Sequence, residues 1–207
     1  MKTLNKEMQA AISPKIALEL LKDGNKRFVN NLKINRNLLQ QANETSDGQH
    51  PFAVILSCID SRTSAELIFD QGLGDIFSVR IAGNIVNEDI LGSMEFGCKV
   101  AGAKIIVVLG HTKCGAVKGA CDDVKLGNLT GLISKIKPAV EQEMTTKENR
   151  SSANSEFVEN VAELNVQLSV KNILLKSPII AEMVKNDEIS IVGGIHEIST
   201  GEVKFFD

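Results

Sequence analysis

Two short segments carry side chains that could build a metal site with an ion pair beside it. The first covers residues 58–62 (CIDSR) and the second covers residues 111–115 (HTKCG). Cysteine sulfur and histidine nitrogen are ligands that zinc prefers in proteins. An aspartate and an arginine two residues apart can form a bidentate ion pair. The residue types therefore predict metal chemistry with a charged pair next to the metal.

Cys58, His111 and Cys114 are the candidate metal ligands. His111 and Cys114 are separated by two residues, a spacing that lets a strand end and a first helical turn point both side chains at one ion. Cys58 can supply a third ligand if its strand is a neighbour. Three protein ligands with one open position are typical of a catalytic zinc site. A structural site usually takes four ligands in CxxC pairs, and this sequence has no CxxC.

The remaining cysteines, Cys98 and Cys121, are expected to be ordinary buried residues, because cysteine often behaves as a small hydrophobic side chain. Four cysteines in 207 residues are too few for a disulfide scaffold. The chain has no Trp and no Tyr. A site that needs an indole or a phenol is therefore excluded.

Asp60 has two candidate roles. It can accept the bidentate pair from Arg62, or it can bind the metal directly as a conditional fourth ligand. The plainest alternative is a solvated surface pair, which would contribute little to stability. We disfavour that alternative because charged pairs in a candidate site are often functional.

The elements that must position these residues are apolar runs that end just before each segment. Residues 52–57 and 105–109 are typical of buried strands in a parallel sheet, where ligands collect at the carboxyl edge. Further strands are expected at 76–80 and 189–193, with a hairpin-like fifth at 201–206. Residues 40–51 are expected to be a loop. Helices are expected at 14–30, 64–69, 88–101, from 114, at 129–143 with a kink at Pro138, at 155–175 and at 179–184. This alternation predicts an α/β fold with a mostly parallel central sheet flanked by helices.

Bulk composition narrows the class of protein. A length of 207 residues favours one domain that spans the chain. The net charge of −3 argues against a large nucleic-acid interface, which needs a concentrated basic face. No apolar stretch is long enough to cross a bilayer, and the first residues lack the apolar centre of a secretory signal. We therefore expect a cytoplasmic protein without nucleic-acid or membrane partners.

The two segments closely resemble those of the β-class carbonic anhydrases, whose motif is Cys-x-Asp-x-Arg followed later by His-x-x-Cys. Residues 80–84 (RIAGN) and 92–96 (GSMEF) add supporting matches, and the similarity runs from about residue 13 to the end. The resemblance implies a β-carbonic-anhydrase-like fold. It also implies a carbonate dehydratase, a lyase that interconverts carbon dioxide and bicarbonate with one Zn²⁺ per subunit.

The resemblance also assigns roles to residues. Cys58, His111 and Cys114 would bind zinc, and Asp60 and Arg62 would be the catalytic dyad. The small substrate pocket would be lined by Gln49, Phe77, Ala82 and Phe96.

The family's building block is a dimer with each active site at the subunit interface, and dimers often pair further. We therefore expect a homodimer or a homotetramer, in which residues 1–35 form a helical arm that packs on a partner subunit. One subclass also holds a non-catalytic bicarbonate between Trp, Arg and Tyr. Arg80 is present here, but Ile55 and His196 stand near the positions of the aromatics. That pocket is not expected in this chain.

The implied reaction runs through a zinc-bound hydroxide. Two thiolates would largely neutralise the zinc, which predicts a water pKa above the value of about 7 seen with three histidines. Asp60 paired with Arg62 would be a weak base, so its expected role is to accept the hydrogen bond of the hydroxide. Activity should then rise with pH. His50 and His196 are candidate proton shuttles, although an ordinary structural role is the simpler reading of each.

Three other functions fit parts of the sequence. Hydrolysis of carbon disulfide or carbonyl sulfide could use the same zinc site. A non-catalytic zinc module would have no use for Asp60 and Arg62. A thiol phosphatase with Cys58 as nucleophile needs a Cys-x5-Arg phosphate loop, and here Arg62 follows after only three residues. We set the phosphatase aside.

Overall fold

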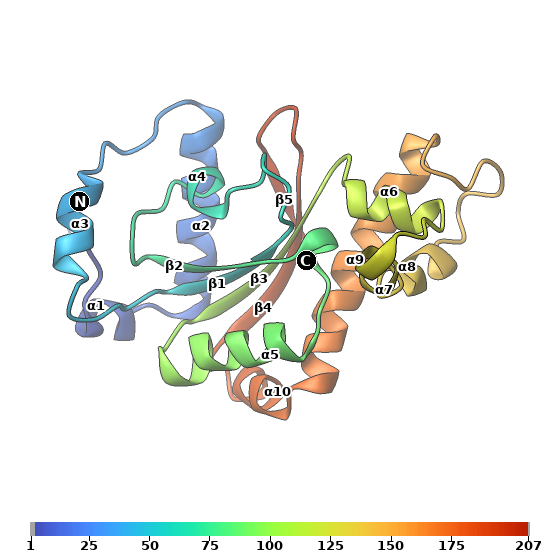
Figure 1. The fold of residues 1–207 in the computed structure, drawn as a ribbon. Coiled ribbons are helices and arrows are strands. Elements are labelled where there is room, and N and C mark those ends of the chain that lie inside the picture. Colours follow the sequence, from blue (N-terminus) through green and yellow to red (C-terminus); the bar gives the residue numbers. More distant parts are fainter. Residues whose placement is uncertain (1–2, 207) are drawn as a thin grey trace.

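A five-stranded sheet forms the centre of the computed structural model, which describes residues 3–206 (Figure 1). Its strands are β1 (Ala53–Ser57), β2 (Ile76–Arg80), β3 (Ile105–His111), β4 (Ser190–His196) and β5 (Val203–Phe205). They lie in the order β2-β1-β3-β4-β5. The first four are parallel, and β5 pairs antiparallel with β4. The predicted α/β fold with a mostly parallel sheet is confirmed.

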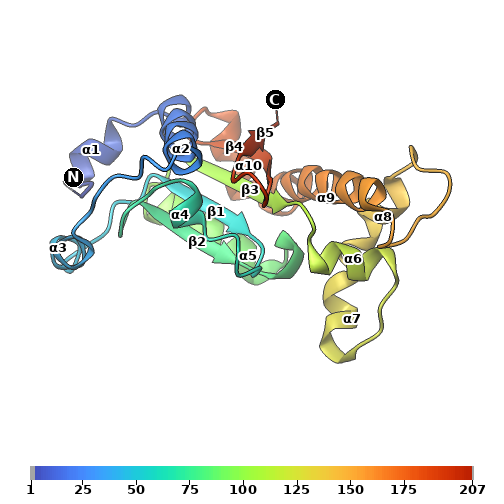
Figure 2. The same cartoon turned by 90° about the horizontal axis from the view of Figure 1, so that it is seen from above.

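Helices cover both faces of this sheet (Figures 1 and 2). They are α1 (Lys6–Ala10), α2 (Pro14–Val29), α3 (Leu38–Glu44), α4 (Ala65–Ile68), α5 (Glu88–Glu95), α6 (Gly115–Cys121), α7 (Gly127–Ile133), α8 (Lys137–Gln142), α9 (Ser155–Lys176) and α10 (Pro178–Lys185). A 3-10 turn, η1 (Ala82–Asn84), follows β2, and one π-helical turn, η2 (Phe96–Val100), extends α5.

The central strands are apolar throughout because they are buried on both faces. Along β1, Val54 and Leu56 pack with α5, α6, α9 and α10, whereas Ala53 and Ile55 pack with α2 and α4. All residues of β1 and β3 are buried. The rigid core therefore fixes where each of these two strands ends, and their carboxyl ends carry the candidate ligands.

Two expected helices differ in the structure. The expected helix over 129–143 is wrong: it is two helices, α7 and α8, with Pro138 in the first turn of the second. Proline has no N–H to continue a helix but fits the first turn of a new one. The helix expected over 88–101 is α-helical only as far as Glu95. The π turn η2 then continues it, and there the Ala101 N–H donates to the Phe96 carbonyl.

The loop expected over 40–51 was wrong in its first part, because α3 extends to Glu44. Asn37 caps this helix by accepting a hydrogen bond from the Gln40 N–H. This N-cap residue is visible in the sequence, but the polar composition of the segment favoured a loop. The short helix α1 was not expected. Asn5 caps it in the same way through the Met8 N–H.

The N-terminal segment packs on the sheet of its own chain. Ala17 and Leu21 of α2 are fully buried in the smaller core cluster. Asn25 donates to the Gly201 carbonyl and accepts the Val203 N–H, which ties α2 to β5. Its outer side nevertheless carries exposed apolar residues. These include Ile16, Leu20, Val29 and Leu32.

Within residues 3–206, no helix combines the length and the hydrophobicity needed to span a bilayer.

Candidate metal centre

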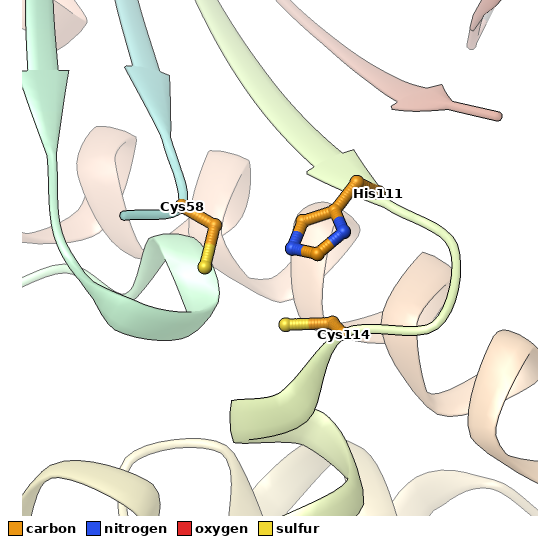
Figure 3. A group of neighbouring side chains, drawn as sticks. All are labelled: Cys58, His111 and Cys114. Atoms are coloured by element: carbon orange, nitrogen blue, oxygen red, sulfur yellow. The ribbon is translucent and has the colours of Figure 1, made fainter. Parts of the chain in front are cut away.

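Three buried ligand side chains meet at the carboxyl edge of the sheet (Figure 3). Cys58 directly follows β1, His111 is the last residue of β3, and Cys114 is the N-cap of α6. β1 and β3 are hydrogen-bonded neighbours, so their ends arrive side by side. One ligand atom from each residue lies within 4.8 Å of the other two. The sequence prediction that these three side chains converge is confirmed, and together they could hold a metal ion.

A hydrogen bond to the backbone of the next residue orients the imidazole of His111. Nδ1 lies 2.9 Å from the Thr112 carbonyl oxygen, so Nδ1 carries the proton that is donated. Nε2 is buried and has no hydrogen-bond partner within residues 3–206. A buried nitrogen without a partner is costly unless something binds it. The nitrogen left free is therefore available to a metal, as in other sites where a second contact fixes the tautomer.

The two cysteine sulfurs share their environment. The neighbouring Cys114 thiol lowers the pKa of Cys58, and the Gly83 N–H acts in the same direction. The Gly83 nitrogen lies 3.3 Å from the Cys58 sulfur. Cys58 and burial in turn raise the pKa of Cys114. Ionisation of one of the two thiols is therefore favourable. A cation between the sulfurs would also favour ionisation of the second thiol.

Gly83 approaches the sulfur because it has no side chain. Its φ of 68° lies in the left-handed region that favours glycine. A Cβ here would lie 2.6 Å from the Cδ1 atom of Ile136. The Gly83 carbonyl accepts a hydrogen bond of 2.8 Å from the buried Asn165 side chain. The η1 turn is thus fixed from α9 and presents one N–H to Cys58.

Asp60 and Arg62 form the bidentate ion pair expected from the sequence. Arg62 Nε donates to Asp60 Oδ1 at 2.9 Å, and Arg62 Nη2 donates to Asp60 Oδ2 at 2.8 Å. These hydrogen bonds hold the pKa of Asp60 well below its usual range. Asp60 Oδ2 lies 4.0 Å from His111 Nε2. The carboxylate therefore borders the ligand cluster while it remains paired with Arg62.

Arg80 braces the same loop, a role that the sequence reasoning missed. Its Nε donates to the Cys58 carbonyl at 3.0 Å, and its Nη2 donates to the Asp60 carbonyl at 2.7 Å. Arg80 ends β2 and lies in register with Ser57 of β1. Aligning the ends of the two predicted strands could have placed it beside Cys58.

The four expected pocket residues do not all reach this cluster within one chain. Ala82 does, because it adjoins Gly83. Phe77 pairs in register with Val54, roughly 13 Å of strand before Cys58. Phe96 packs edge-on against Phe77, with ring centroids 6.2 Å apart, and is largely exposed. Gln49 precedes β1 and therefore lies at the amino edge of the sheet, opposite the ligands.

The other cysteines and histidines lie outside the ligand cluster. Cys98 is buried in the core, and burial raises its pKa to about 12; Cys121 is half-buried with its pKa raised to about 11. His196 pairs in register with His111. Burial lowers the pKa of His196 to about 4, which makes it a poor proton acceptor near neutral pH. His50 is half-buried in the loop before β1.

The donor set suits zinc. Two thiolates and one imidazole are soft and borderline ligands that zinc binds tetrahedrally, and three protein ligands leave a fourth position open. Asp60 would lie beside a metal held there, because its Oδ2 is 4.0 Å from His111 Nε2. The arrangement can therefore support metal chemistry on a small molecule.

Comparisons with known proteins agree with this site. The carbonic anhydrase family model matches residues 53–203. Carbonic anhydrase 2 of Mycobacterium tuberculosis is 34% identical, with 94% of each chain covered. The carbonic anhydrase of Mycolicibacterium smegmatis is 33% identical over 93% of each chain. The β-carbonic anhydrase CafA of Aspergillus fumigatus superimposes with a TM-score of 0.73 at 28% identity, covering 82% of this chain and 81% of that one. The chain therefore belongs to the β-class carbonic anhydrase family of enzymes.

Proposed function

We propose that this enzyme interconverts carbon dioxide and bicarbonate with one zinc ion per subunit, held by Cys58, His111 and Cys114. The observation that carries the proposal is the convergence of three buried donor atoms within 4.8 Å at one sheet edge. The unpartnered His111 Nε2 supports it independently. When bound, zinc supplies a Lewis acid that lowers the pKa of a water molecule.

Asp60 and Arg62 form the proposed catalytic dyad. Because Arg62 keeps the Asp60 carboxylate ionised, Asp60 accepts hydrogen bonds and is a weak base. Its position beside His111 Nε2 lets it accept a hydrogen bond from a proton-bearing group at the open position. An anion without a proton would be repelled there. The dyad thus selects which species occupies the site and aims its lone pair at the substrate.

Asp60 could also serve as a conditional fourth ligand. To do so, it must give up the two Arg62 contacts of 2.9 and 2.8 Å, and Arg62 would lose its partner. With Asp60 paired to Arg62, the fourth position would be open to substrate. The closed form would block the position that substrate needs.

We propose that Gln49, Phe77 and Phe96 line the pocket of a partner subunit, whereas Ala82 lines the pocket of its own. Their distance from Cys58 within one chain supports this division. Phe77 and Phe96 lie at the β2 edge of the sheet, which has no strand beyond it within residues 3–206. Phenylalanine rings would give an apolar wall that suits a small nonpolar gas.

This division requires at least a homodimer, and pairs of dimers would give a homotetramer. The exposed apolar side chains on the outer side of residues 1–35 support a partner packing on this arm of the single domain. A solved relative from Sordaria macrospora, described as a tetrameric β-carbonic anhydrase, is 26% identical with a TM-score of 0.70, covering 79% of this chain and 84% of that one. The cytoplasmic location remains a prediction.

Hydrolysis of carbon disulfide or carbonyl sulfide on the same site is not favoured, since the named relatives are carbonic anhydrases. A non-catalytic zinc module is not favoured either. Its ligands would have no need of a carboxylate that faces the open position.

The test combines a metal assay with stopped-flow hydration of carbon dioxide. Purified wild type should contain one zinc per chain and hydrate carbon dioxide. Cys58→Ser should lose most of both. Cys121→Ser, which changes a cysteine outside the cluster, should keep both. Wild-type protein that binds no zinc when it is supplied, or loaded protein without hydration activity, would refute the proposal.

A further inference from the structure

The turn between β3 and α6 contains a residue in an unfavourable backbone conformation. Lys113 has a φ of 58°, in the left-handed region that side chains other than glycine rarely adopt. It lies directly before Cys114 and two residues after His111. This turn reverses the chain so that the Cys114 sulfur faces Cys58 and the His111 ring (Figure 3). Something must hold the Lys113 peptide against its own preference.

Glu159 supplies that hold. Its Oε1 accepts a hydrogen bond of 3.0 Å from the Lys113 N–H. Glu159 belongs to α9, and three neighbours on that helix are fully buried: Phe157, Val158 and Val161. The carboxylate is therefore mounted on a rigid part of the core. A charge-assisted hydrogen bond from such a platform is among the stronger ones available to a backbone N–H.

The rest of the turn is held from the other side, by the end of β4. The Thr112 hydroxyl donates to Glu197 at 3.1 Å and accepts the Ile198 N–H at 3.1 Å. The Thr112 N–H donates to the His196 carbonyl at 3.0 Å. These contacts hold the hydroxyl and the N–H of Thr112, but none of them reaches the peptide that joins Thr112 to Lys113. That peptide carries the Lys113 N–H held by Glu159 and the Thr112 carbonyl that orients His111. The direction in which Cys114 leaves the turn depends on the peptide that Glu159 holds.

We propose that Glu159 is a positioning residue of the metal site, which acts by holding Lys113 in the left-handed conformation that presents the Cys114 sulfur. This inference rests on the proposed zinc site, and it adds a carboxylate from a distant helix to the machinery. Glu159 does not touch the ligand atoms. Its role is to preorganise one of them, as outer contacts do in other metal sites.

The test measures how fast zinc leaves the protein to an excess of a coloured chelator. Glu159→Ala should release zinc about 10- to 100-fold faster than wild type, the range typical when a supporting contact of a metal site is lost. Glu159→Gln keeps an oxygen acceptor but loses the charge, so its zinc release should be slower than that of Glu159→Ala and closer to wild type. Glu156→Ala changes an exposed carboxylate in the first turn of the same helix and should have no effect.

A second substitution separates positioning from a general loss of stability. Glycine adopts positive φ readily, so adding Lys113→Gly to Glu159→Ala should restore slow zinc release. Lys113→Ala removes the same charge but keeps a Cβ, and it should restore nothing. In cobalt-substituted protein, the thiolate-to-cobalt absorption should weaken in Glu159→Ala and recover only with the glycine. Should Glu159→Ala fail to fold, the double variant with glycine should fold and bind zinc.

Wild-type zinc release in Glu159→Ala, or no recovery with Lys113→Gly, would overturn the inference. Both results presuppose zinc-loaded wild type. Absence of zinc from the wild-type protein would instead refute the proposed function itself.

Discussion

The loop after β1 combines a ligand and a charged dyad within five residues. Arg80 donates to the carbonyls of Cys58 and Asp60, so one side chain braces the backbone of both residues. Arg62 grips the Asp60 side chain separately through both carboxylate oxygens. The consequence is that Asp60 can be changed without removing a ligand atom from the cluster.

Asp60→Asn should therefore separate catalysis from metal binding. An amide has one acceptor oxygen and places an N–H where the carboxylate had a second, so it repels a donor at the open position. We expect kcat/KM for carbon dioxide hydration to fall by about 10²- to 10⁴-fold, while zinc content stays at the wild-type level. Asp123→Asn, in an exposed ion pair with Lys125, is the matched control. Full activity in Asp60→Asn would exclude the dyad.

Cys98 tests whether a buried cysteine outside the ligand cluster contributes to metal binding or only to stability. It lies in the core beside α5, and burial raises its pKa to about 12. Cys98→Ala should lower the free energy of unfolding by about 1–2 kcal/mol through lost packing, with zinc content unchanged. Denaturant titration and a metal assay measure the two effects. Loss of zinc in this variant would mean that the ligand set is misassigned.

The metal-ligating residues could be predicted from the sequence, but the residues that hold them in position could not. Cys58, His111 and Cys114 could be recognised because their types and their places after apolar runs suffice. Glu159 could not, because its partner is a backbone N–H 46 positions away in the chain. Nothing in a sequence marks an N–H as needing an acceptor. Positive φ at a lysine leaves no local signal either.

At the scale of elements, the η1 turn links β2 to the metal centre. Gly83 combines positive φ with close packing against Ile136, and its N–H reaches the Cys58 sulfur. The turn packs against Ile136, which precedes α8, and its Gly83 carbonyl accepts a hydrogen bond from Asn165 of α9. The turn therefore couples helix packing to the environment of one ligand.

Gly83→Ala should damage folding and the site together. The new Cβ would meet Ile136 Cδ1 at 2.6 Å and the backbone would be strained, so we expect a loss of about 1–3 kcal/mol. Zinc release should also accelerate, because relief of the clash and the strain would move the residue 83 N–H away from the Cys58 sulfur. Gly131→Ala is the control: no atom lies within 4 Å of its Cβ, and alanine favours helix α7. Equal unfolding midpoints for the two variants would contradict this account.

Glu143 gives the segment after α8 a pH dependence. Burial raises the pKa of Glu143, but hydrogen bonds from Thr145, Thr146 and Arg150 outweigh it and lower the pKa to about 2, from an ordinary value of 4.5. The ionised carboxylate is thus favoured in the folded state. Its stabilisation is fully present above pH 4.5 and is lost as pH falls through about 2.

Glu143→Gln should be less stable than wild type at pH 7, by about 1–3 kcal/mol because charged hydrogen bonds are lost. The difference should shrink between pH 4.5 and 2. Denaturant unfolding of both proteins across this range measures it. Glu148→Gln is the control, since Glu148 is exposed in the same segment. A difference that grows as pH falls would contradict the assignment.

Helices and strands could be predicted where the apolar pattern is long. They could not be predicted where an N-cap residue or a proline determines whether a helix begins or ends. The strands and α9 follow from buried runs and helical periodicity. The break between α7 and α8 depends on whether Pro138 kinks a helix or begins one, and the local sequence allows both. Tertiary packing of α8 against α9 settles the choice.

At the scale of the whole molecule, the expected site residues fall at opposite edges of one sheet. Cys58 lies at the carboxyl end of β1, and Gln49 lies before its amino end. The Pro51 carbonyl accepts from Gln9, and Phe52 pairs with Asp75, which holds this loop at the amino edge. Roughly 23 Å of extended chain separates Pro51 from Cys58. If Gln49 serves a site, that site belongs to another copy of the chain.

Mixing two impaired variants tests this arrangement directly. Cys58→Ser lacks a ligand, and Gln49→Ala lacks a pocket residue, so each homodimer should hydrate carbon dioxide poorly. In a mixed dimer with twofold symmetry, one site would combine both changes and the other would combine neither. Unfolding, mixing and refolding with zinc should therefore restore about a quarter of wild-type activity. The control mixes Cys58→Ser with His111→Ala, which impair the same subunit's ligand set; in that mixture each site lacks a ligand and activity should stay low. If Gln49 acted on its own Cys58, the first mixture would stay as inactive as the control.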